Sequence, residues 1–285
     1  MNTIHTQDGT SLYLNHQRIE PKGSGNSVCL IVHGLGEHSG RYTNFPKELA
    51  EAGGDFFSEY YFLDQRGHGR SGGPRGDAPT FETLTDDLES VVKRIREENP
   101  GHKLVIFAHS FGGLVVLYSL LKKRVSPDGV IISAPLLRIA FEVPKIKEVF
   151  GKLIKNVLPG IQLKNEVNPG HLSHDPEVAV QYIQDRLVHQ KITPRLYFTM
   201  REAMDWIMTD PAAVKSGLGC PSLFLVPTED KVVDATATLE FYRKLDDLSK
   251  NLREYPGFYH EAVNETEKQK VFGDMAKWLK SILKN

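Results

Sequence analysis

Short apolar runs alternate with longer segments of helical periodicity along most of this 285-residue chain. Runs rich in branched and aromatic residues, each closed by turn-forming residues, are predicted to be buried strands: 27–33, 60–64, 103–109, 129–133 and 222–227. Segments with apolar residues at helical spacing are predicted to be helices: 42–52, 81–98, 114–124, 235–245 and 268–283. Because strands that alternate with helices pack as a mostly parallel sheet covered on both faces, the pattern predicts the α/β class. Residues 11–19 are predicted to add an antiparallel strand at the edge of the sheet.

The alternation stops after residue 137. The 80 residues from 138 to 217 carry helical patterns and no convincing strand. A connection between a helix and a strand in such a sheet usually takes about 2 to 6 residues, so this stretch is too long for a simple loop. We therefore predict a core of residues 1–137 and 218–285, with a helical cap of residues 138–217 inserted between the two parts. Neither an internal repeat nor a low-complexity tract suggests another organisation.

Composition excludes several classes of protein. With 40% hydrophobic and 25% charged residues, the chain can bury the core of one large globular domain. The formal net charge is −1 and lysine and arginine are spread along the chain, so there is no basic field for nucleic acid and no such partner is expected. Cys29 and Cys220 are predicted to be packed core or loop thiols rather than a disulfide framework, which suits a reducing compartment.

The N-terminal residues, MNTIHTQDGT, have neither the charged start nor the apolar centre of an export signal. No stretch approaches the roughly 18 continuous apolar residues of a membrane span. We expect a soluble cytoplasmic protein on these grounds, with peripheral contact to a membrane left open.

The run IFAHSFGG, residues 106–113, ends an apolar strand at a serine surrounded by small residues. A predicted helix follows Ser110, so the serine is expected on a sharp strand-to-helix turn that holds its hydroxyl at the carboxyl edge of the sheet. The positions two before and two after the serine must be small to let the helix approach the neighbouring strand, and Ala108 and Gly112 meet this need. The pattern indicates a nucleophilic serine, and a serine that only caps the next helix is the alternative.

A serine hydroxyl needs a base to take its proton and an acid to orient that base. In a sheet of this type the acid and the base follow the serine in chain order, each on a loop after a later strand. Asp230 lies on such a loop and is the expected acid. Asp234 directly precedes a helical run, where a role at the helix N-terminus explains it better, and Glu229 would need a different loop geometry. His260 follows the last apolar stretch, residues 252–255, and is the expected general base.

Two backbone N–H groups are expected to stabilise the oxyanion of the tetrahedral intermediate. The sequence HGLG, residues 33–36, follows an early strand, and its glycines allow the loop to turn the Leu35 N–H toward the active site. The second donor is the Phe111 N–H, because it follows the serine and begins the helix, whose positive dipole end adds to the effect.

The other histidines near these motifs have simpler interpretations. His109 adjoins Ser110, but neighbouring side chains on a tight turn diverge, so we expect His109 to be buried and hydrogen-bonded. His33 and His68 lie in glycine-flanked turns, which they are expected to order.

No metal and no other cofactor is expected. His171, His174 and Asp175 form a short cluster, but no further ligand accompanies them at a recognisable metal-binding spacing.

Several stretches together resemble the monoacylglycerol lipase and lysophospholipase family of α/β-hydrolases: HGLGEHSGRY (33–42), DQRGHGRSGGPRG (64–76), AHSFGG (108–113), TEDKVVD (228–234) and GFYHE (257–261). Residues 172–193 are also similar to that family's cap, so the likeness covers nearly the whole chain. The resemblance implies the α/β-hydrolase fold and long-chain monoacylglycerols or related lipid esters as substrates. It also implies a site made of a catalytic triad and two oxyanion donors: Ser110, Asp230 and His260 with Leu35 and Phe111.

Three features depart from the family pattern. Ala108 and Phe111 stand where glycine and methionine are common, and the stretch GGDFFSEYYFLD is longer than the usual approach to its aspartate. The two substitutions leave the chemistry intact but can reshape the acyl pocket beside the serine.

The expected activity is hydrolysis of a lipid ester, most readily of monoacylglycerols to fatty acid and glycerol, through an acyl-enzyme on Ser110. A lysophospholipase or a broad carboxylesterase is the first alternative. A serine aminopeptidase and a catalytically silent binding protein on the same fold are further alternatives, of which the first would need an acidic pocket for the substrate amine.

The predicted cap carries apolar residues that have two interpretations. Residues 146–158 form an amphipathic helical pattern with lysines on its polar side and flanks, which either packs over the core or opens toward a membrane or micelle surface. Other large side chains either line an acyl tunnel or serve as core: Phe141, Tyr197, Phe198, Met200, Met204 and Trp206.

Overall fold

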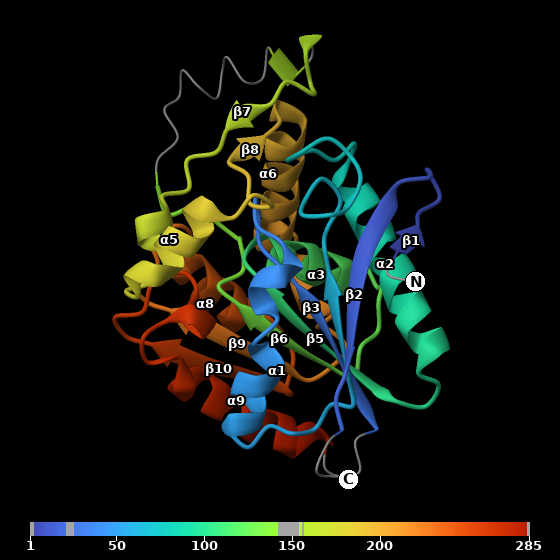
Figure 1. The fold of residues 1–285 in the computed structure, drawn as a ribbon, viewed down its shortest axis with the longest axis vertical. Coiled ribbons are helices and arrows are strands. Elements are labelled where there is room, and N and C mark those ends of the chain that lie inside the picture. The colour runs from blue at the N-terminus through green and yellow to red at the C-terminus, as the bar shows by residue number, and fades with distance from the viewer. Residues whose placement is uncertain (1–2, 21–25, 142–153, 156, 284–285) are drawn as a thin grey trace.

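A central sheet organises the protein. The structure, a computed structural model, describes residues 3–20, 26–141, 154–155 and 157–283 (Figure 1). Eight strands form the sheet in the order β1-β2-β4-β3-β5-β6-β9-β10. In chain order they are β1 (Thr3–His5), β2 (Ser11–Arg18), β3 (Ser27–Val32), β4 (Glu59–Leu63), β5 (Lys103–His109), β6 (Gly129–Ser133), β9 (Ser222–Pro227) and β10 (Lys250–Tyr255). β2 runs antiparallel to β1 and β4, and every pair from β4 to β10 is parallel. The predicted mostly parallel sheet is confirmed.

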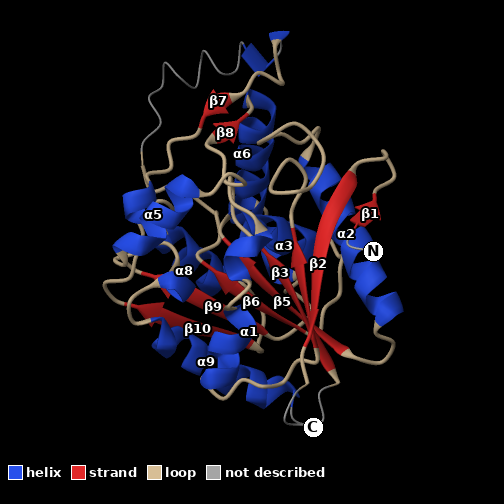
Figure 2. Cartoon of the chain, in the orientation of Figure 1, coloured by secondary structure: helices blue, strands red, loops and turns tan. Residues whose placement is uncertain are grey.

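Helices cover both faces of the sheet (Figure 2). One face packs against α1 (Phe45–Glu51) and α9 (Lys268–Leu283). The other face packs against α2 (Phe81–Glu98), α3 (Phe111–Leu121) and α8 (Ala235–Lys244). Short 3-10 helices lie in loops that precede α-helices: η1 (Ser39–Tyr42), η2 (Pro169–His171) and η3 (Ala262–Asn264).

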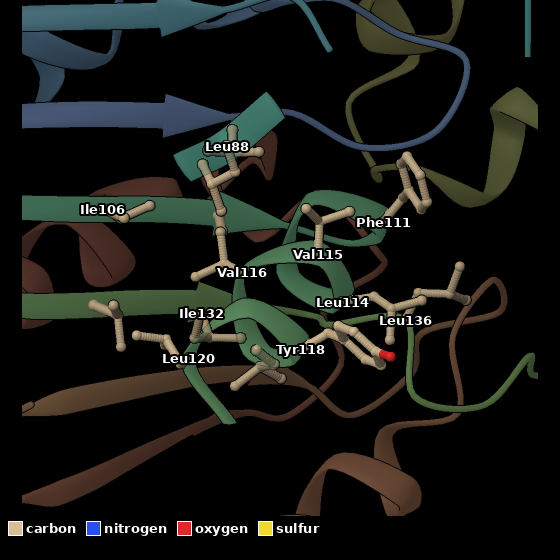
Figure 3. Packing of buried hydrophobic residues seen from close by; sticks show 14 of the residues in the cluster. Leu88, Ile106, Phe111, Leu114, Val115, Val116, Tyr118, Leu120, Ile132 and Leu136 are labelled. Atoms are coloured by element: carbon tan, nitrogen blue, oxygen red, sulfur yellow. The ribbon is translucent and has the colours of Figure 1, made fainter. Parts of the chain in front are cut away.

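The two apolar cores on either side of the sheet follow from the alternation of side chains along each strand. In β5, Leu104 and Ile106 belong to the core beneath α2 and α3, whereas Val105 and Phe107 belong to the core beneath α1 and α9. All residues of α3 are buried, as expected of a helix that is apolar all round. Figure 3 shows side chains of α3 packed over Ile106 and Ile132 of the adjacent strands. The element that follows the predicted nucleophile is therefore held rigidly in the core.

The predicted strands and helices of the core agree with the structure to within three residues at each end. Two details differ. The sequence predicts residues 11–19 as the edge strand, but β1 pairs with β2 on its outer side and forms the edge. β1 was not predicted because three residues are too few to show a periodic pattern. α3 begins at Phe111 and not at residue 114, so no residue separates the turn at Ser110 from the helix.

Residues 138–217 connect β6 to β9. They contain α5 (Pro176–Gln184), α6 (Pro194–Thr209) and α7 (Pro211–Lys215). α5 lies with β7 and β8 beyond one end of the sheet strands (Figure 1), whereas α6 packs against α2 and α3, and α7 packs against α8. The antiparallel pair of β7 (Leu163–Lys164) and β8 (Lys191–Ile192) contradicts the expectation of a region without strands; each has two residues, too few for an alternating pattern. The amphipathic pattern of residues 146–158 falls mostly outside the described residues. We call residues 138–217 the cap, as a proposed unit.

None of the helices within the described ranges is long and apolar enough to cross a membrane. Cys29 and Cys220 are free and buried, so their predicted packing is confirmed. Burial raises the pKa of the Cys220 thiol to about 12, which leaves it protonated and unreactive at neutral pH.

A single glycine in α3 should control how closely this helix approaches β3. A Cβ atom added to Gly112 would lie 2.5 Å from the carbonyl oxygens of Val32 and His33. Because backbone must shift to relieve this overlap, Gly112→Ala is expected to lower the free energy of unfolding by about 1–3 kcal/mol in urea titrations. Gly273→Ala in α9 is the matched control: none of the described residues outside its own helix turn lies within 4 Å of its added Cβ, so alanine should be tolerated there. Equal unfolding free energies for the two variants would contradict the prediction.

Candidate active site

Ser110 lies between β5 and α3 in a strained backbone conformation. Its φ is 53° and its ψ is −117°, values that residues with a side chain rarely adopt. The Ser110 N–H donates to the Ser133 carbonyl at 3.0 Å, and the Ser110 carbonyl accepts from the Leu136 N–H at 3.0 Å. These bonds to the end of β6 and to the residues just after it hold Ser110 in place. The predicted strand-to-helix turn is present, and it fixes the serine at the carboxyl end of β5.

His260 joins Ser110 to Asp230. The His260 Nε2 lies 2.9 Å from the Ser110 Oγ, and its Nδ1 lies 2.6 Å from an Asp230 oxygen. An ionised carboxylate can only accept, so Nδ1 carries the proton and Nε2 is left to accept from the serine hydroxyl. The structure thus brings together three residues predicted from separate parts of the sequence.

Asp230 is held by the loop that follows β9. One of its oxygens accepts from the N–H groups of Val232 and Val233 at 2.8 and 2.9 Å, which leaves the other for His260. Asp234 instead caps α8 by accepting from the Thr236 N–H at 2.9 Å, so its predicted structural role is confirmed. Glu229 is exposed on the same loop.

The carboxylates around His260 stabilise the protonated form of its imidazole. Burial is the largest single influence and lowers its pKa, but the charge and hydrogen bond of Asp230, with smaller contributions from Glu261 and Glu37, outweigh burial. The pKa of His260 is therefore raised above its ordinary value. An imidazole that must accept a proton during a reaction is stabilised in its charged form by this arrangement.

The HGLG loop, residues 33–36, lies directly against the serine. A Cβ atom added to Gly34 would be 3.2 Å from the Ser110 Cβ. In the part of the chain that the structure describes, no hydrogen-bond acceptor takes the N–H of Leu35 or of Phe111. The N–H of Phe111 is also at the first residue of α3, where the helix dipole is positive. Both predicted oxyanion donors are therefore free to bind an anion.

A buried guanidinium connects the HGLG loop to the loop of His260, which we define as residues 256–261. Arg41 donates to Glu37 at 2.5 Å and to both oxygens of Glu261 at 2.7 and 2.8 Å. Glu37 also accepts from the Gly34 N–H at 2.6 Å and the Tyr42 hydroxyl at 2.8 Å. Burial opposes ionisation of Glu37, yet the Arg41 charge prevails and the pKa of Glu37 falls to about 2.

The Arg41 cluster was not identified from the sequence. Its signal was present in GEHSGRY, residues 36–42, where four charged or titratable residues stand among glycine and serine, and in the glutamate directly after His260. A charge next to a catalytic loop needs a partner when the loop is buried, and this requirement could have suggested the pairing.

The predictions for His33 and His109 have different outcomes. His33 orders its turn by bonding the Gly34 carbonyl at 2.7 Å and the Gln65 N–H at 3.0 Å. His109 is buried as predicted, with its ring 4.6 Å from that of His260. The predicted hydrogen bond is not found at the His109 Nδ1, which has no partner among the described residues. Burial and the His260 charge lower the pKa of His109 to about 4, so it stays neutral.

A cavity of about 210 Å³ opens over Ser110 and His260. Apolar side chains of the core and the cap supply most of its lining, among them Phe141, Leu172, Tyr197, Phe198, Met200 and Val232. Met204 and Trp206, which were candidates for the same tunnel, do not line it. Trp206 instead packs against Tyr118 and Lys122. The serine hydroxyl thus faces a space suited to a hydrocarbon chain.

Within the described ranges, no group of three or more His, Cys, Asp or Glu side chains is placed to hold a metal ion. Of the cluster considered from the sequence, His174 binds Glu265 at 2.9 Å and Asp175 caps α5 by accepting from the Glu177 N–H.

Comparison with known proteins connects this geometry to a family. A family model described as serine aminopeptidase, S33, matches residues 23–267. A monoacylglycerol lipase of Mycolicibacterium smegmatis is 27% identical over 264 residues, which cover 93% of this chain and 90% of that protein. The crystal structure of Paleococcus ferrophilus monoacylglycerol lipase has 30% sequence identity and a TM-score of 0.80, covering 95% of this chain and 98% of the other.

A longer relative is also similar. An uncharacterized abhydrolase domain-containing protein of Dictyostelium discoideum is 31% identical over 267 residues. These cover 93% of this chain but only 27% of that protein, so the chain spans about a quarter of this relative's length.

The charge of Asp230 should be what raises the pKa of His260. Asp230→Asn removes that charge while burial continues to disfavour the imidazolium, so the pKa of His260 is expected to fall. An NMR titration of the His260 ring resonances measures the change. Asp234→Asn is the matched control, because asparagine also caps helices and Asp234 does not contact the ring. A pKa of His260 that is the same in Asp230→Asn and in the wild type would disprove this account.

Proposed function

The chain belongs to the serine aminopeptidase S33 family of α/β-hydrolases, and from this premise we propose that it is a serine hydrolase of lipid esters, with monoacylglycerols as its preferred substrates. One observation carries the proposal: an apolar cavity ends at a serine whose hydroxyl is hydrogen-bonded to His260, which is in turn hydrogen-bonded to Asp230.

The reaction would proceed through an acyl-enzyme. Ser110 Oγ attacks the ester carbonyl carbon while His260 Nε2 takes the hydroxyl proton. The bond from carbon to the alcohol oxygen then breaks, and the alcohol leaves with the proton from His260. Water attacks the acyl-serine with His260 again acting as base, which releases the fatty acid and restores Ser110. Asp230 holds the imidazole in the required tautomer throughout.

Two backbone donors would stabilise the negative charge that develops on the carbonyl oxygen. The N–H groups of Leu35 and Phe111 suit this role because the described residues leave both without an acceptor. Phe111 directly follows Ser110, and Leu35 follows Gly34, which lies against the Ser110 side chain. Loss of one donor of this kind typically costs about 3 kcal/mol in the transition state. Since both donors are backbone groups, side-chain identity at residue 111 can vary without loss of the oxyanion contact.

The cavity supports a long acyl chain as the group bound beside Ser110. Each methylene that moves from water into an apolar site contributes about 0.8 kcal/mol. The proposed cap, residues 138–217, supplies Phe141, Leu172 and Phe198 to the lining, while Val232 comes from the core. The names of the Mycolicibacterium and Paleococcus relatives agree with an acylglycerol as the substrate class.

An aminopeptidase would need an unpaired carboxylate for the substrate amine. The cavity lining includes Glu37, Glu166 and Glu261. Glu37 and Glu261 are ion-paired to Arg41, which disfavours recognition of an amine by either residue. The mostly apolar lining and the names of the lipase relatives support the ester as the substrate, despite the name of the matching family.

Contact with a lipid surface is a further part of the proposal. Near the cavity, the cap exposes apolar side chains beside Lys164: Val157, Leu158, Ile161 and Leu163. Exposed apolar groups flanked by lysine suit transient contact with a membrane or micelle that carries the substrate.

Removal of the nucleophile should abolish activity. Ser110→Ala is expected to lower kcat/KM for p-nitrophenyl esters by about a thousandfold or more and to prevent labelling by a fluorophosphonate. Ser90→Ala on α2 is the matched control, because the one side-chain bond of Ser90 to the described residues is to the carbonyl of Asp86 within its own helix. Turnover retained by Ser110→Ala would exclude this residue as the nucleophile.

The substrate class can be tested with one panel of compounds. Monoacylglycerols, lysophospholipids, short esters and aminoacyl amides are compared by kcat/KM, and monoacylglycerols should rank first. Within a series of soluble esters, each added methylene should raise kcat/KM by up to about fourfold until the cavity is full. Preference for aminoacyl amides would support the peptidase instead. Inactivity toward every class would support a binding protein.

A further inference from the structure

A buried carboxylate lies where the His260 loop meets the cap. Glu265 follows η3, and only 1% of its side chain is exposed. One oxygen accepts from the Tyr259 N–H at 2.8 Å and from the His174 ring at 2.9 Å. The other accepts from the N–H groups of His174 and Thr266 at 3.2 and 3.1 Å. Glu265 therefore binds the His260 loop and the cap with the same carboxylate.

The backbone on both sides of His260 is fixed by this junction. The Tyr259 N–H, just before His260, donates to Glu265. The Glu261 N–H, just after His260, donates to the carbonyl of Leu172 in the cap at 2.8 Å. The residue that carries the imidazole is thus held between two anchored peptide groups, and both anchors involve the cap.

The ring of Tyr259 adds contacts to the same junction. Its centroid lies 3.7 Å from that of the His174 ring. Lys231, which directly follows Asp230, lies 4.1 Å from the Tyr259 centroid and 2.6 Å from its hydroxyl. The cap, the acid loop and the base loop therefore meet at Tyr259, one residue from the imidazole.

The ionised form of Glu265 is the one that these contacts favour. Burial raises its pKa, but the hydrogen bonds from Tyr259, His174 and Thr266 outweigh burial, and the pKa is lowered. A buried carboxylate with several donors is costly to disrupt, because each donor would lose its partner in a site that excludes water. Displacement of a catalytic group by about 1 Å can cost two orders of magnitude in rate, so an anchor this close to His260 bears on the chemistry.

We propose that Glu265 is a positioning residue for His260, acting with cap residues 172–175 to hold the imidazole in register with Ser110. The inference rests on the proposed function, because it concerns the general base of that reaction. Glu265 does not contact Ser110, Asp230 or the His260 ring; it acts through the peptide groups beside the ring.

Glu265→Gln tests the proposal with little change in size. The amide replaces one acceptor oxygen by an N–H donor, which then faces an N–H group of Tyr259, His174 or Thr266. The second-order rate constant for fluorophosphonate labelling, and kcat for a short soluble p-nitrophenyl ester, are expected to fall about ten- to a hundredfold, with KM for that ester little changed. Glu267→Gln is the matched control, because Glu267 is exposed two residues further along and pairs only with Lys270 among the described residues.

The labelling experiment separates positioning from folding. Irreversible loss of part of the protein lowers the fraction labelled at long times, but the folded remainder reacts at the wild-type rate. Reversible unfolding lowers the observed rate constant only in proportion to the folded fraction, which a urea titration of the variant measures. A misplaced imidazole lowers the rate constant of the whole labelled fraction. A wild-type rate constant in Glu265→Gln would overturn the inference.

A second variant covers the case in which Glu265→Gln does not fold. His174 is 43% exposed, so His174→Ala should fold while it removes the ring contacts to Glu265 and Tyr259. It is expected to lower the labelling rate constant less than Glu265→Gln, and an unchanged constant would overturn the inference.

A wild-type chain that hydrolyses no ester and resists labelling would refute the proposed function and this inference together. An active wild type with unimpaired variants would refute the inference alone.

Discussion

The backbone conformation of Ser110 is the constraint on which the site depends. A positive φ at this residue turns the chain from β5 directly into α3, so the hydroxyl projects beyond the sheet and does not enter the apolar core. The strain of about 1–3 kcal/mol is tolerated because α3 is completely buried and cannot shift. Parallel pairing then brings the carboxyl ends of β9 and β10 to the same edge of the sheet. Asp230 and His260 lie on the short loops that follow these two strands.

Burial alone does not distinguish the histidine that can serve as a base. His68, His109, His189 and His260 are all largely buried, and desolvation disfavours the charged form of each. The first three have lowered pKa values, whereas that of His260 is raised. The difference lies in Asp230, whose carboxylate bonds the His260 Nδ1. One ion pair thus distinguishes His260 from the other three imidazoles, whose lowered pKa values keep them neutral at pH 7.

The sequence predicted those parts of the protein that depend on local patterns. Ser110 follows a strand and precedes a helix, and the order of strands in a parallel sheet then limits where Asp230 and His260 can stand. The Arg41 cluster could not be predicted in this way, because Arg41 and Glu261 are 220 residues apart and meet only after two irregular loops have folded. Loops lack a periodicity from which side-chain direction can be read. The β7–β8 pair was missed for another reason: each strand has only two residues, too few to show the alternation by which a strand is recognised.

Contacts between cap and core show why the cavity and the reacting groups should be regarded as one structure. The cap bonds the HGLG loop, since the His189 N–H donates to the Gly36 carbonyl at 2.8 Å, and it bonds the His260 loop through Leu172. Leu35, a predicted oxyanion donor, and His260, the predicted base, are therefore each next in sequence to a residue that is hydrogen-bonded to the cap. A displacement large enough to open the cavity along that side would have to break bonds to both loops. The shape of the cavity and the positions of Leu35 and His260 are consequently coupled through the backbone.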